Sequence, residues 1–336
     1  MRRLLIVRLS ALGDIVHGLP VLASLRAAHP DAEIDWLVDQ RYRAVLDLVD
    51  GVSRQQVWQF PRLAGSGGVA ELIGRLRASR YDAAIDLQGL LKSAVLARLS
   101  GARRVIGFDR RELREPRAAA CYTERVSPGA YAHVIEKNLA LARAAGATST
   151  EFVFPVRAGE TPALAEARAR LGVREGQPYI LLNPGAGWPN KQWSPARFGK
   201  VAAALRARHG WPSCVLWGPS ERELADRVVV ASAGAACEAP PTQLADVVAL
   251  AQGAAAMVSG DTGPTQLACA VGTPIVALFG PTDPVRNGPW GARSVVLSRH
   301  DHCECRWARR CHRPRPCLDE IAVADVVAGV ERVVEG

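Results

Sequence analysis

The sequence predicts an α/β protein made of two domains, each built around a parallel sheet. Short, continuously apolar segments alternate along the chain with segments of helical periodicity, which is typical of parallel strands joined by crossover helices. This alternation starts again in the second half of the chain. The length of 336 residues also suits two domains of ordinary size.

In the first half, strands are expected where an apolar run is bounded by turn residues. Residues 4–7 are apolar throughout, as in a strand that is buried on both faces of a sheet. Residues 14–28 have helical spacing, and Pro30 ends the expected helix. The other elements expected in this half are strands at 34–38, 52–58 and 83–87 and helices at 44–49 and 72–78.

The second half repeats this pattern after a segment rich in glycine and proline, 157–177, where we place the domain boundary. Ligands of such Rossmann-like sheets bind at the carboxyl ends of the strands, so we expect a site in a cleft between the domains. The predicted strands are 179–182, 213–217, 255–259 and 274–279, and the predicted helices are 195–208, 221–232 and 322–334. The predicted domains are 1–158 and 178–318, with a linker at 159–177 and a C-terminal helix at 319–336.

The chain is basic, and the positive charge comes almost entirely from arginine. It has 42 Lys and Arg against 33 Asp and Glu, a net charge of +9, and only four of the cations are lysines. Arginine favours bidentate binding of phosphate or carboxylate, so the partner could be nucleic acid, an anionic membrane surface or an anionic small substrate. The alternative explanation of the arginine excess is codon bias. No apolar run approaches the roughly 20 residues of a membrane-spanning helix. The N-terminus is strand-like and lacks the pattern of a signal peptide, so a cytoplasmic location is expected.

The first candidate site is the segment 10–17, which directly follows the first predicted strand. Gly13 permits a tight turn, and Asp14 begins the next helix, where aspartate commonly caps the helix and complements its dipole. The same carboxylate could act as a general base toward an acceptor hydroxyl. The spacing does not fit G-x-G-x-x-G, so no dinucleotide-binding fingerprint is predicted. His17 is either a core residue or a cleft residue.

Two further candidate sites follow predicted strands of the second half. In 183–193, small residues would let backbone N–H groups approach a phosphate, and Lys191 would add a point charge, although an ordinary surface loop has the same composition. The Walker spacing is absent, which argues against a nucleoside triphosphatase. In 259–267, Asp261 to Gly263 would present a carboxylate, a hydroxyl and free amides at a helix N-terminus, which suits sugar hydroxyls or a diphosphate as well as simple capping.

The C-terminal region contains four cysteines within fifteen residues, flanked by two histidines. Such a cluster could bind zinc, but C-x-C-x5-C-x5-C is not a standard zinc-finger spacing. A reduced tail or a partly disulfide-linked tail are the alternatives. The residues concerned are Cys303, Cys305, Cys311 and Cys317, with His302 and His312.

Together these motifs resemble the ADP-heptose:lipopolysaccharide heptosyltransferases of glycosyltransferase family 9, which have the GT-B fold. The resemblance covers nearly the whole chain, and the stretches 88–93 and 114–116 are most similar to heptosyltransferase I. The order and spacing of the motifs make it specific. They are the segments 10–17, 86–93, 114–116, 183–193, 217–219, 261–264 and 280–284.

The resemblance implies roles for individual residues. Asp14 would deprotonate the acceptor hydroxyl, and Lys191 would hold the donor diphosphate and stabilise the departing ADP. Glu221 would reach the ribose, with Glu223 as the alternative. The implied donor-binding residues are Gly185, Ala186, Gly187, Lys191, Glu221, Asp261, Thr262, Gly263 and Pro264, and the implied acceptor-binding residues are Ser10, Gly13, His17, Lys92 and Arg114.

The implied reaction is an inverting transfer of L-glycero-D-manno-heptose from ADP-heptose to the Kdo region of the lipopolysaccharide inner core, without a metal or other cofactor. The acceptor would be an anionic glycolipid of the Kdo-lipid A type, met at the cytoplasmic face of the inner membrane. Gln266 stands where many members have histidine, and Gly185, Ala186 and Gly187 replace hydroxyl-bearing residues of some members. The arginines expected to favour such an acceptor are Arg62, Arg103, Arg104, Arg110, Arg111, Arg114 and Arg117.

Three other functions are considered. A family 9 transferase could use a heptosylated core or a protein as acceptor. A catalytically silent member could serve as a binding module, against which the intact Asp14, Lys191 and Asp261 argue. A nucleic-acid-binding protein with a zinc-bound tail is the alternative from another class, but the cations are scattered and no recognised binding motif is present.

Overall fold

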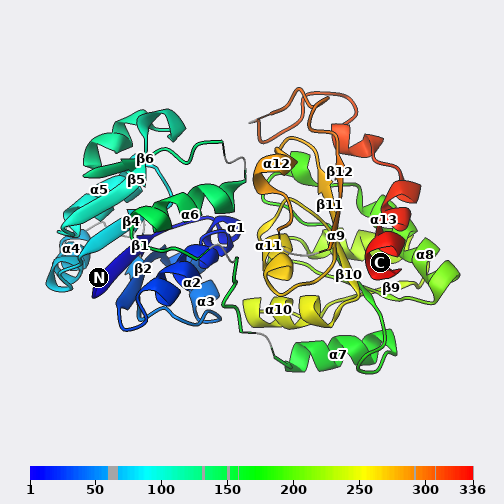
Figure 1. Cartoon of the computed structure of the whole chain (residues 1–336). Helices are drawn as coiled ribbons and strands as arrows, with labels where there is room; N and C mark the ends of the chain where they lie inside the picture. Colours follow the sequence, from blue (N-terminus) through cyan, green and yellow to red (C-terminus); the bar gives the residue numbers. More distant parts are fainter. Residues whose placement is uncertain are drawn as a thin grey trace. The chain divides into compact units, whose positions relative to one another are not determined.

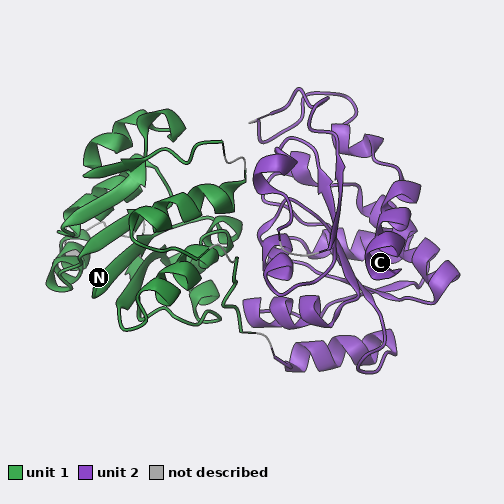
Figure 2. Ribbon diagram, in the orientation of Figure 1, with its two compact units in different colours: residues 1–157 green, residues 158–336 purple. Residues whose placement is uncertain are grey.

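The computed structural model describes residues 1–59, 67–130, 133–149, 152–157, 159–290, 293–306 and 308–335. The chain divides into two compact units, unit 1 from Met1 to Arg157 and unit 2 from Ala158 to Gly336 (Figure 2). Each unit contains a six-stranded sheet whose neighbouring strands are all parallel. The predicted α/β class with two parallel sheets is therefore confirmed.

The sheet of unit 1 has the order β3-β2-β1-β4-β5-β6. The chain moves outward from β1 to β3 and then returns to place β4 on the other side of β1 (Figure 1). This reversal makes the carboxyl ends of β1 and β4 the switch point where ligands of such sheets bind. The strands are β1 Arg3–Val7, β2 Glu33–Asp39, β3 Arg54–Trp58, β4 Ala83–Asp86, β5 Arg104–Phe108 and β6 Glu124–Val126.

Helices cover this sheet, and α2 packs against α6 while α4 packs against α5. The fully buried apolar residues of β1 meet these layers, as its uniform hydrophobicity predicts. The helices are α1 Leu12–Val16, α2 Leu19–Ala28, α3 Arg43–Leu46, α4 Gly67–Ala78, α5 Leu91–Leu99 and α6 Val134–Ala144, with short 3-10 turns η1 Gln40–Tyr42, η2 Arg110–Glu112 and η3 Pro116–Cys121.

The single helix expected over 14–28 is wrong, because two helices occupy this stretch. The first, α1, ends at Val16, and α2 begins at Leu19. Pro20 is the physical reason: it cannot donate a backbone hydrogen bond, and in a continuous helix its ring would clash with the carbonyl group of Val16. At the start of α2 the missing N–H costs nothing.

Unit 2 repeats the topology with the order β12-β11-β10-β7-β8-β9, so its switch point lies between β7 and β10. The helix α7, Pro162–Leu171, occupies part of the stretch predicted as a linker and packs against α10. The strands are β7 Ile180–Asn183, β8 Ser213–Val215, β9 Ala236–Glu238, β10 Ala256–Gly260, β11 Ile275–Phe279 and β12 Ser294–Ser298. The remaining helices are η4 Pro189–Lys191, α8 Pro195–His209, α9 Arg222–Ala231, α10 Leu244–Gly253, α11 Gly263–Ala270, α12 Pro284–Asn287, η5 Cys317–Glu320 and α13 Val323–Glu335.

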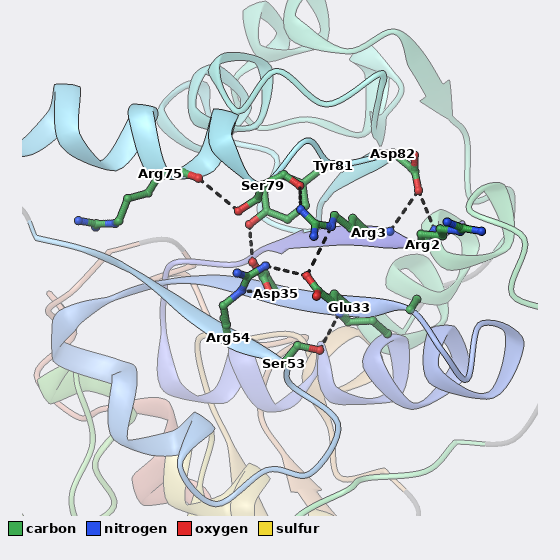
Figure 3. A network of polar contacts seen from close by, with 12 residues as sticks. Arg2, Arg3, Glu33, Asp35, Ser53, Arg54, Arg75, Ser79, Tyr81 and Asp82 are labelled. Atoms are coloured by element: carbon green, nitrogen blue, oxygen red, sulfur yellow. Dashed lines mark hydrogen bonds and ion pairs between the residues drawn. The ribbon is translucent and has the colours of Figure 1, made fainter.

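A polar network fastens the amino ends of β1, β2 and β3 in unit 1 (Figure 3). Asp35 of β2 is fully buried and accepts hydrogen bonds from Tyr81 Oη at 2.6 Å and from Arg54 Nε at 3.3 Å. Arg54 also pairs with Glu33 at 2.8 Å, and Glu33 lies 3.5 Å from Arg3 Nε. Glu33 and Asp35 therefore each have an arginine partner at this end of the sheet.

Among the residues that the structure describes, no helix combines the length and the apolar character needed to cross a bilayer.

Candidate functional site

Asp14 lies beyond the carboxyl end of β1, where an arginine and a backbone amide contact its carboxylate. Its Oδ2 accepts a hydrogen bond from the Ala11 N–H at 3.2 Å, and its Oδ1 pairs with Arg8 Nη2 at 2.7 Å. Arg8 is buried and also donates to the carbonyl oxygen of Leu87. Asp14 is the third residue of α1, so it caps the helix by accepting the Ala11 N–H, and its side chain is still 42% exposed. The carboxylate is thus oriented by its partners and open to solvent.

The loop after β4 supports the loop that carries Asp14. Gln88 Oε1 accepts the N–H of Leu9 at 2.8 Å, and Gln88 Nε2 donates to Ser10 Oγ at 3.4 Å. His17 is buried at 4% exposure, and its ring packs edge-on against His133 with the centroids 5.8 Å apart. The structure thus places His17 among core residues, and its acceptor-binding role stays a prediction.

Asp86, the buried first residue of the 86–93 motif, was given no role from the sequence and holds the start of α5. Asp86 accepts hydrogen bonds from Ser93 Oγ at 3.0 Å and from Tyr122 Oη at 2.8 Å, as well as from the amides of Gln88 and Gly89. Burial raises the pKa of Asp86, and these hydrogen bonds oppose the rise. Hydrogen bonds to Asp86 therefore fix the turn that leads into Lys92.

The predicted acceptor-binding cations of unit 1 are exposed. Lys92 lies in the first turn of α5, and Arg114 follows η2. At the carboxyl end of β2, Asp39 pairs with Arg41 at 2.8 Å, and the hydrogen bond from Arg41 and the charge of Lys92 both lower the pKa of Asp39. Sequence reasoning missed Asp39 and Arg41, although their position directly after a strand was the available signal. Arg62 lies outside the described residues.

In unit 2, the structure brings Lys191 and Asp261 together. Lys191 ends η4 after β7, Asp261 lies in the turn between β10 and α11, and Lys191 Nζ is 2.7 Å from Asp261 Oδ2. Their side chains are 17% and 14% exposed, so this ion pair is better shielded than the one of Asp14. Lys191 Nζ also lies 5.1 Å from the centre of the Trp188 ring, within the range of a cation–π contact.

Hydroxyl and amide side chains fix the N-terminus of α11 beside this pair. Thr262 caps α11 by accepting the Thr265 N–H at 3.4 Å, and Asn183 Nδ2 donates to Thr262 Oγ1 at 3.0 Å. Gly263 and Pro264 open the helix; Pro264 has no N–H and Thr262 accepts that of Thr265, so the N–H that this first turn can offer to an anion is that of Gly263. Such an end favours a bound anion. Gln266, in the predicted histidine position, donates instead to the carbonyl oxygen of Asn287 at 3.0 Å.

The glycine-rich loop after β7 lies against Glu221. A Cβ atom on Gly185 would come within 2.2 Å of Glu221 Oε2, so only glycine allows this close approach. The same carboxylate oxygen accepts the N–H of Gly218 at 3.1 Å. Glu223 is exposed in the first turn of α9. Ala186 accepts a hydrogen bond from Gln192, whereas a Cβ on Gly187 would meet no described atom within 4 Å.

Two candidate ligand-binding ends are thus present, an exposed ion-paired carboxylate in unit 1 and a shielded lysine–aspartate pair at a helix N-terminus in unit 2. The model of glycosyltransferase family 9 (heptosyltransferase) matches residues 69–315. The chain belongs to glycosyltransferase family 9.

Similarity to individual members of family 9 extends over nearly the whole chain. The sequence is 33% identical to lipopolysaccharide heptosyltransferase 1 of Pseudomonas aeruginosa over 313 residues, which cover 90% of this chain and 85% of that protein. It is 30% identical to lipopolysaccharide heptosyltransferase 3 of Escherichia coli over 338 residues, which cover 96% of each. The fold matches that of the E. coli heptosyltransferase WaaC with ADP, with a TM-score of 0.76 and 26% identity over 98% of this chain and 99% of that one.

The family predicted from the motifs is therefore confirmed, and the chain is a glycosyltransferase. Its two units with parallel sheets match the GT-B structures of this family, so the GT-B prediction is confirmed as well.

The cysteines of the C-terminal region pack together in this family 9 protein. Cys303, Cys305 and Cys317 are buried, and Cys311 packs against them. The Sγ atoms of Cys305 and Cys311 lie 3.1 Å apart; this contact lowers the pKa of Cys305, and burial raises the pKa of Cys311. In the described parts of the chain, no group of three or more His, Cys, Asp and Glu is arranged to hold a metal ion. The zinc alternative therefore gains no support from the geometry.

Proposed function

We propose that this protein is an inverting heptosyltransferase of lipopolysaccharide core biosynthesis, which transfers L-glycero-D-manno-heptose from ADP-heptose to the Kdo region of the inner core. The observation that carries the proposal is the ion pair of Lys191 and Asp261 at the N-terminus of α11, because it suits a sugar diphosphate. The similarity to a heptosyltransferase 1 and to WaaC with ADP supports the choice of donor and acceptor.

In unit 2, the donor is proposed to bind through its diphosphate. Lys191 and the amides of Thr262 and Gly263 interact with the phosphate oxygens, and Asp261 accepts hydrogen bonds from heptose hydroxyls. Glu221, which lies against the Gly185 loop, binds the ribose. As the bond from the anomeric carbon to the diphosphate breaks, negative charge grows on ADP, and these donors stabilise it more than they stabilise the bound substrate.

In unit 1, Asp14 is proposed to be the general base. Its exposed carboxylate takes the proton of the acceptor hydroxyl while the oxygen attacks the anomeric carbon and ADP departs with the bonding electron pair. A single displacement inverts the configuration at that carbon. Arg8 acts as a positioning residue, since it holds one oxygen of the carboxylate from the buried side.

The acceptor is proposed to be an anionic glycolipid of the Kdo-lipid A type. Lys92 and Arg114 are exposed cations that can bind its carboxylates or phosphates. Because this acceptor is a membrane lipid, the proposal places the enzyme peripherally at the cytoplasmic face of the inner membrane, where anionic headgroups attract basic residues.

A second acceptor, a heptosylated core, is favoured by the 30% identity to a heptosyltransferase 3. The deciding experiment incubates the protein with ADP-heptose and either Kdo-lipid A or a heptosylated core, and weighs the products. We expect a mass increase of one heptose on Kdo-lipid A alone. Transfer to the heptosylated core alone would replace the Kdo acceptor, and transfer to neither would refute the proposal.

A further inference from the structure

The cysteine-containing segment 303–317 contacts the loop that carries Lys191. Asn190, which is 5% exposed, donates a hydrogen bond from Nδ2 to the carbonyl oxygen of Ala308 at 2.6 Å. The guanidinium carbon of Arg309 lies 5.9 Å from the centre of the Trp188 ring, which Lys191 Nζ also approaches. Two residues that precede Lys191 in this loop, Trp188 and Asn190, thus contact two residues of the segment.

Ala308 and Arg309 both lie between Cys305 and Cys311 in the sequence. The two Sγ atoms are in direct contact at 3.1 Å, whereas sulfur atoms in a disulfide are about 2.05 Å apart. All eight cysteines are free thiols, and Cys311 is partly exposed while Cys305 is buried. A small-molecule disulfide can therefore reach Cys311, and Cys305 is already in place to attack the mixed disulfide that forms.

We propose that Cys305 and Cys311 form a reversible dithiol–disulfide pair whose state controls how firmly the Lys191 loop is held. The oxidant is a low-molecular-weight disulfide such as oxidised glutathione. The Cys311 thiolate attacks one of its sulfurs and releases one glutathione thiolate, and the Cys305 thiolate then attacks Cys311 Sγ and releases the second. Two protein thiols are oxidised, one external disulfide is reduced to two thiols, and the two protons pass to the released glutathione.

Closing this bond draws Cys305 and Cys311 together and moves the residues between them. The carbonyl group of Ala308 and the side chain of Arg309 then shift relative to Asn190 and Trp188. The Asn190 amide is buried, so water does not simply replace the carbonyl group of Ala308 as its acceptor, and loss of this hydrogen bond costs free energy. In the oxidised protein we therefore expect Lys191 to be less fixed, ADP to bind less tightly and kcat to fall. This catalytic consequence rests on the proposed function, whereas the chemistry of the thiol pair does not.

The test uses the full chain, reduced and then treated with oxidised glutathione. Free thiols are alkylated, and peptide mass spectrometry locates any disulfide. We expect a Cys305–Cys311 disulfide and, by titration calorimetry, a loss of about fivefold in ADP affinity, the size expected when one buried hydrogen bond is lost. Reductant should restore the affinity. Cys311→Ser should remove the response to glutathione, and Cys121→Ser, a partly exposed thiol of unit 1, should keep it.

Asn190→Ala tests the hydrogen bond between Asn190 and Ala308 independently of the thiols. This variant should bind ADP as weakly as the oxidised protein and should still form the disulfide, but its oxidation should change the affinity little further. The proposal is overturned if no Cys305–Cys311 disulfide forms in the folded chain, if it forms and ADP affinity is unchanged, or if the reduced protein holds stoichiometric zinc that blocks alkylation of these thiols. If ADP does not bind in either state but the disulfide still forms, the proposed transferase function has failed and not the thiol chemistry.

Discussion

The two ends of the sheet in unit 1 use the same types of residue for different purposes. At the amino end, Asp35 is fully buried, and its carboxylate accepts hydrogen bonds from Arg54 and Tyr81 (Figure 3). It also accepts one from Gln56 at 3.2 Å. At the carboxyl end, Asp14 pairs with a buried arginine, accepts a backbone N–H and is 42% exposed.

This contrast shows why an arginine-rich composition did not by itself indicate a function. At the amino end, the arginines are engaged with acids of their own chain and serve the sheet. At the carboxyl end, the buried arginine orients a carboxylate that can still meet a substrate. Variants at the two ends should therefore separate loss of stability from loss of activity.

The largest effect is expected for Asp14→Asn. The amide can keep the helix cap but cannot accept the proton of the acceptor, so kcat should fall by about 10²–10⁴-fold. The affinity for ADP-heptose should stay close to that of the parent protein. Because the buried Arg8 loses its charged partner, the unfolding midpoint should fall as well, so kcat is compared per folded molecule. Glu33→Gln, at the amino end, is the matched control and should retain kcat. Turnover at the parent rate in Asp14→Asn would rule out the base assignment.

The next effect is on stability. Asp35→Ala leaves the buried hydroxyl of Tyr81 and the buried amide of Gln56 without this acceptor, whereas the half-exposed Arg54 keeps Glu33. The free energy of unfolding should therefore fall by about 1–3 kcal/mol for each of the two buried groups. Denaturant unfolding measures this change, and activity per folded molecule should be retained. If Asp35→Ala were as stable as the parent protein but inactive, the amino end of the sheet would serve activity and not stability.

Lys191→Ala tests the donor side. Removal of the cation that faces the leaving diphosphate should lower kcat by about 10²-fold, and Lys191→Arg should recover part of the loss. Lys200 is an exposed lysine of α8, so Lys200→Ala is the matched control. An unchanged kcat and donor KM in Lys191→Ala would contradict the proposed role.

The smallest effect concerns Asp39, whose pKa is lowered below its ordinary value of 3.8, chiefly by the hydrogen bond from Arg41. A lowered pKa means that the ionised form contributes stability above the pKa of the unfolded chain, and that this contribution is lost as the pH falls through the folded pKa. Because Arg41 is exposed, Asp39→Asn should cost about 1 kcal/mol at pH 7. Unfolding curves from pH 7 to pH 2 should converge with those of the parent in acid, and a constant difference would refute the assignment.

Local patterns in the sequence predicted most of the strands that carry the site. β1, β7, β10 and β11 are continuous apolar runs, and the motifs after them identified Asp14, Lys191 and Asp261. Short strands such as β6 and β9 were not predicted, because three residues are too few to show a hydrophobic period. The break between α1 and α2 depended on one proline within an otherwise helical pattern.

By itself, the sequence determined the α/β class, the repeat of the pattern in two halves and the identity of the candidate residues, because strand and helix periodicity and turn chemistry are local properties. The tertiary structure decided which of these residues act on one another. Lys191 meets Asp261 across 70 residues of chain, and Asn190 meets Ala308 across 118. Such pairs arise when parallel strands bring their carboxyl ends to one edge, and the burial that sets the strength of each pair exists only once the layers have packed.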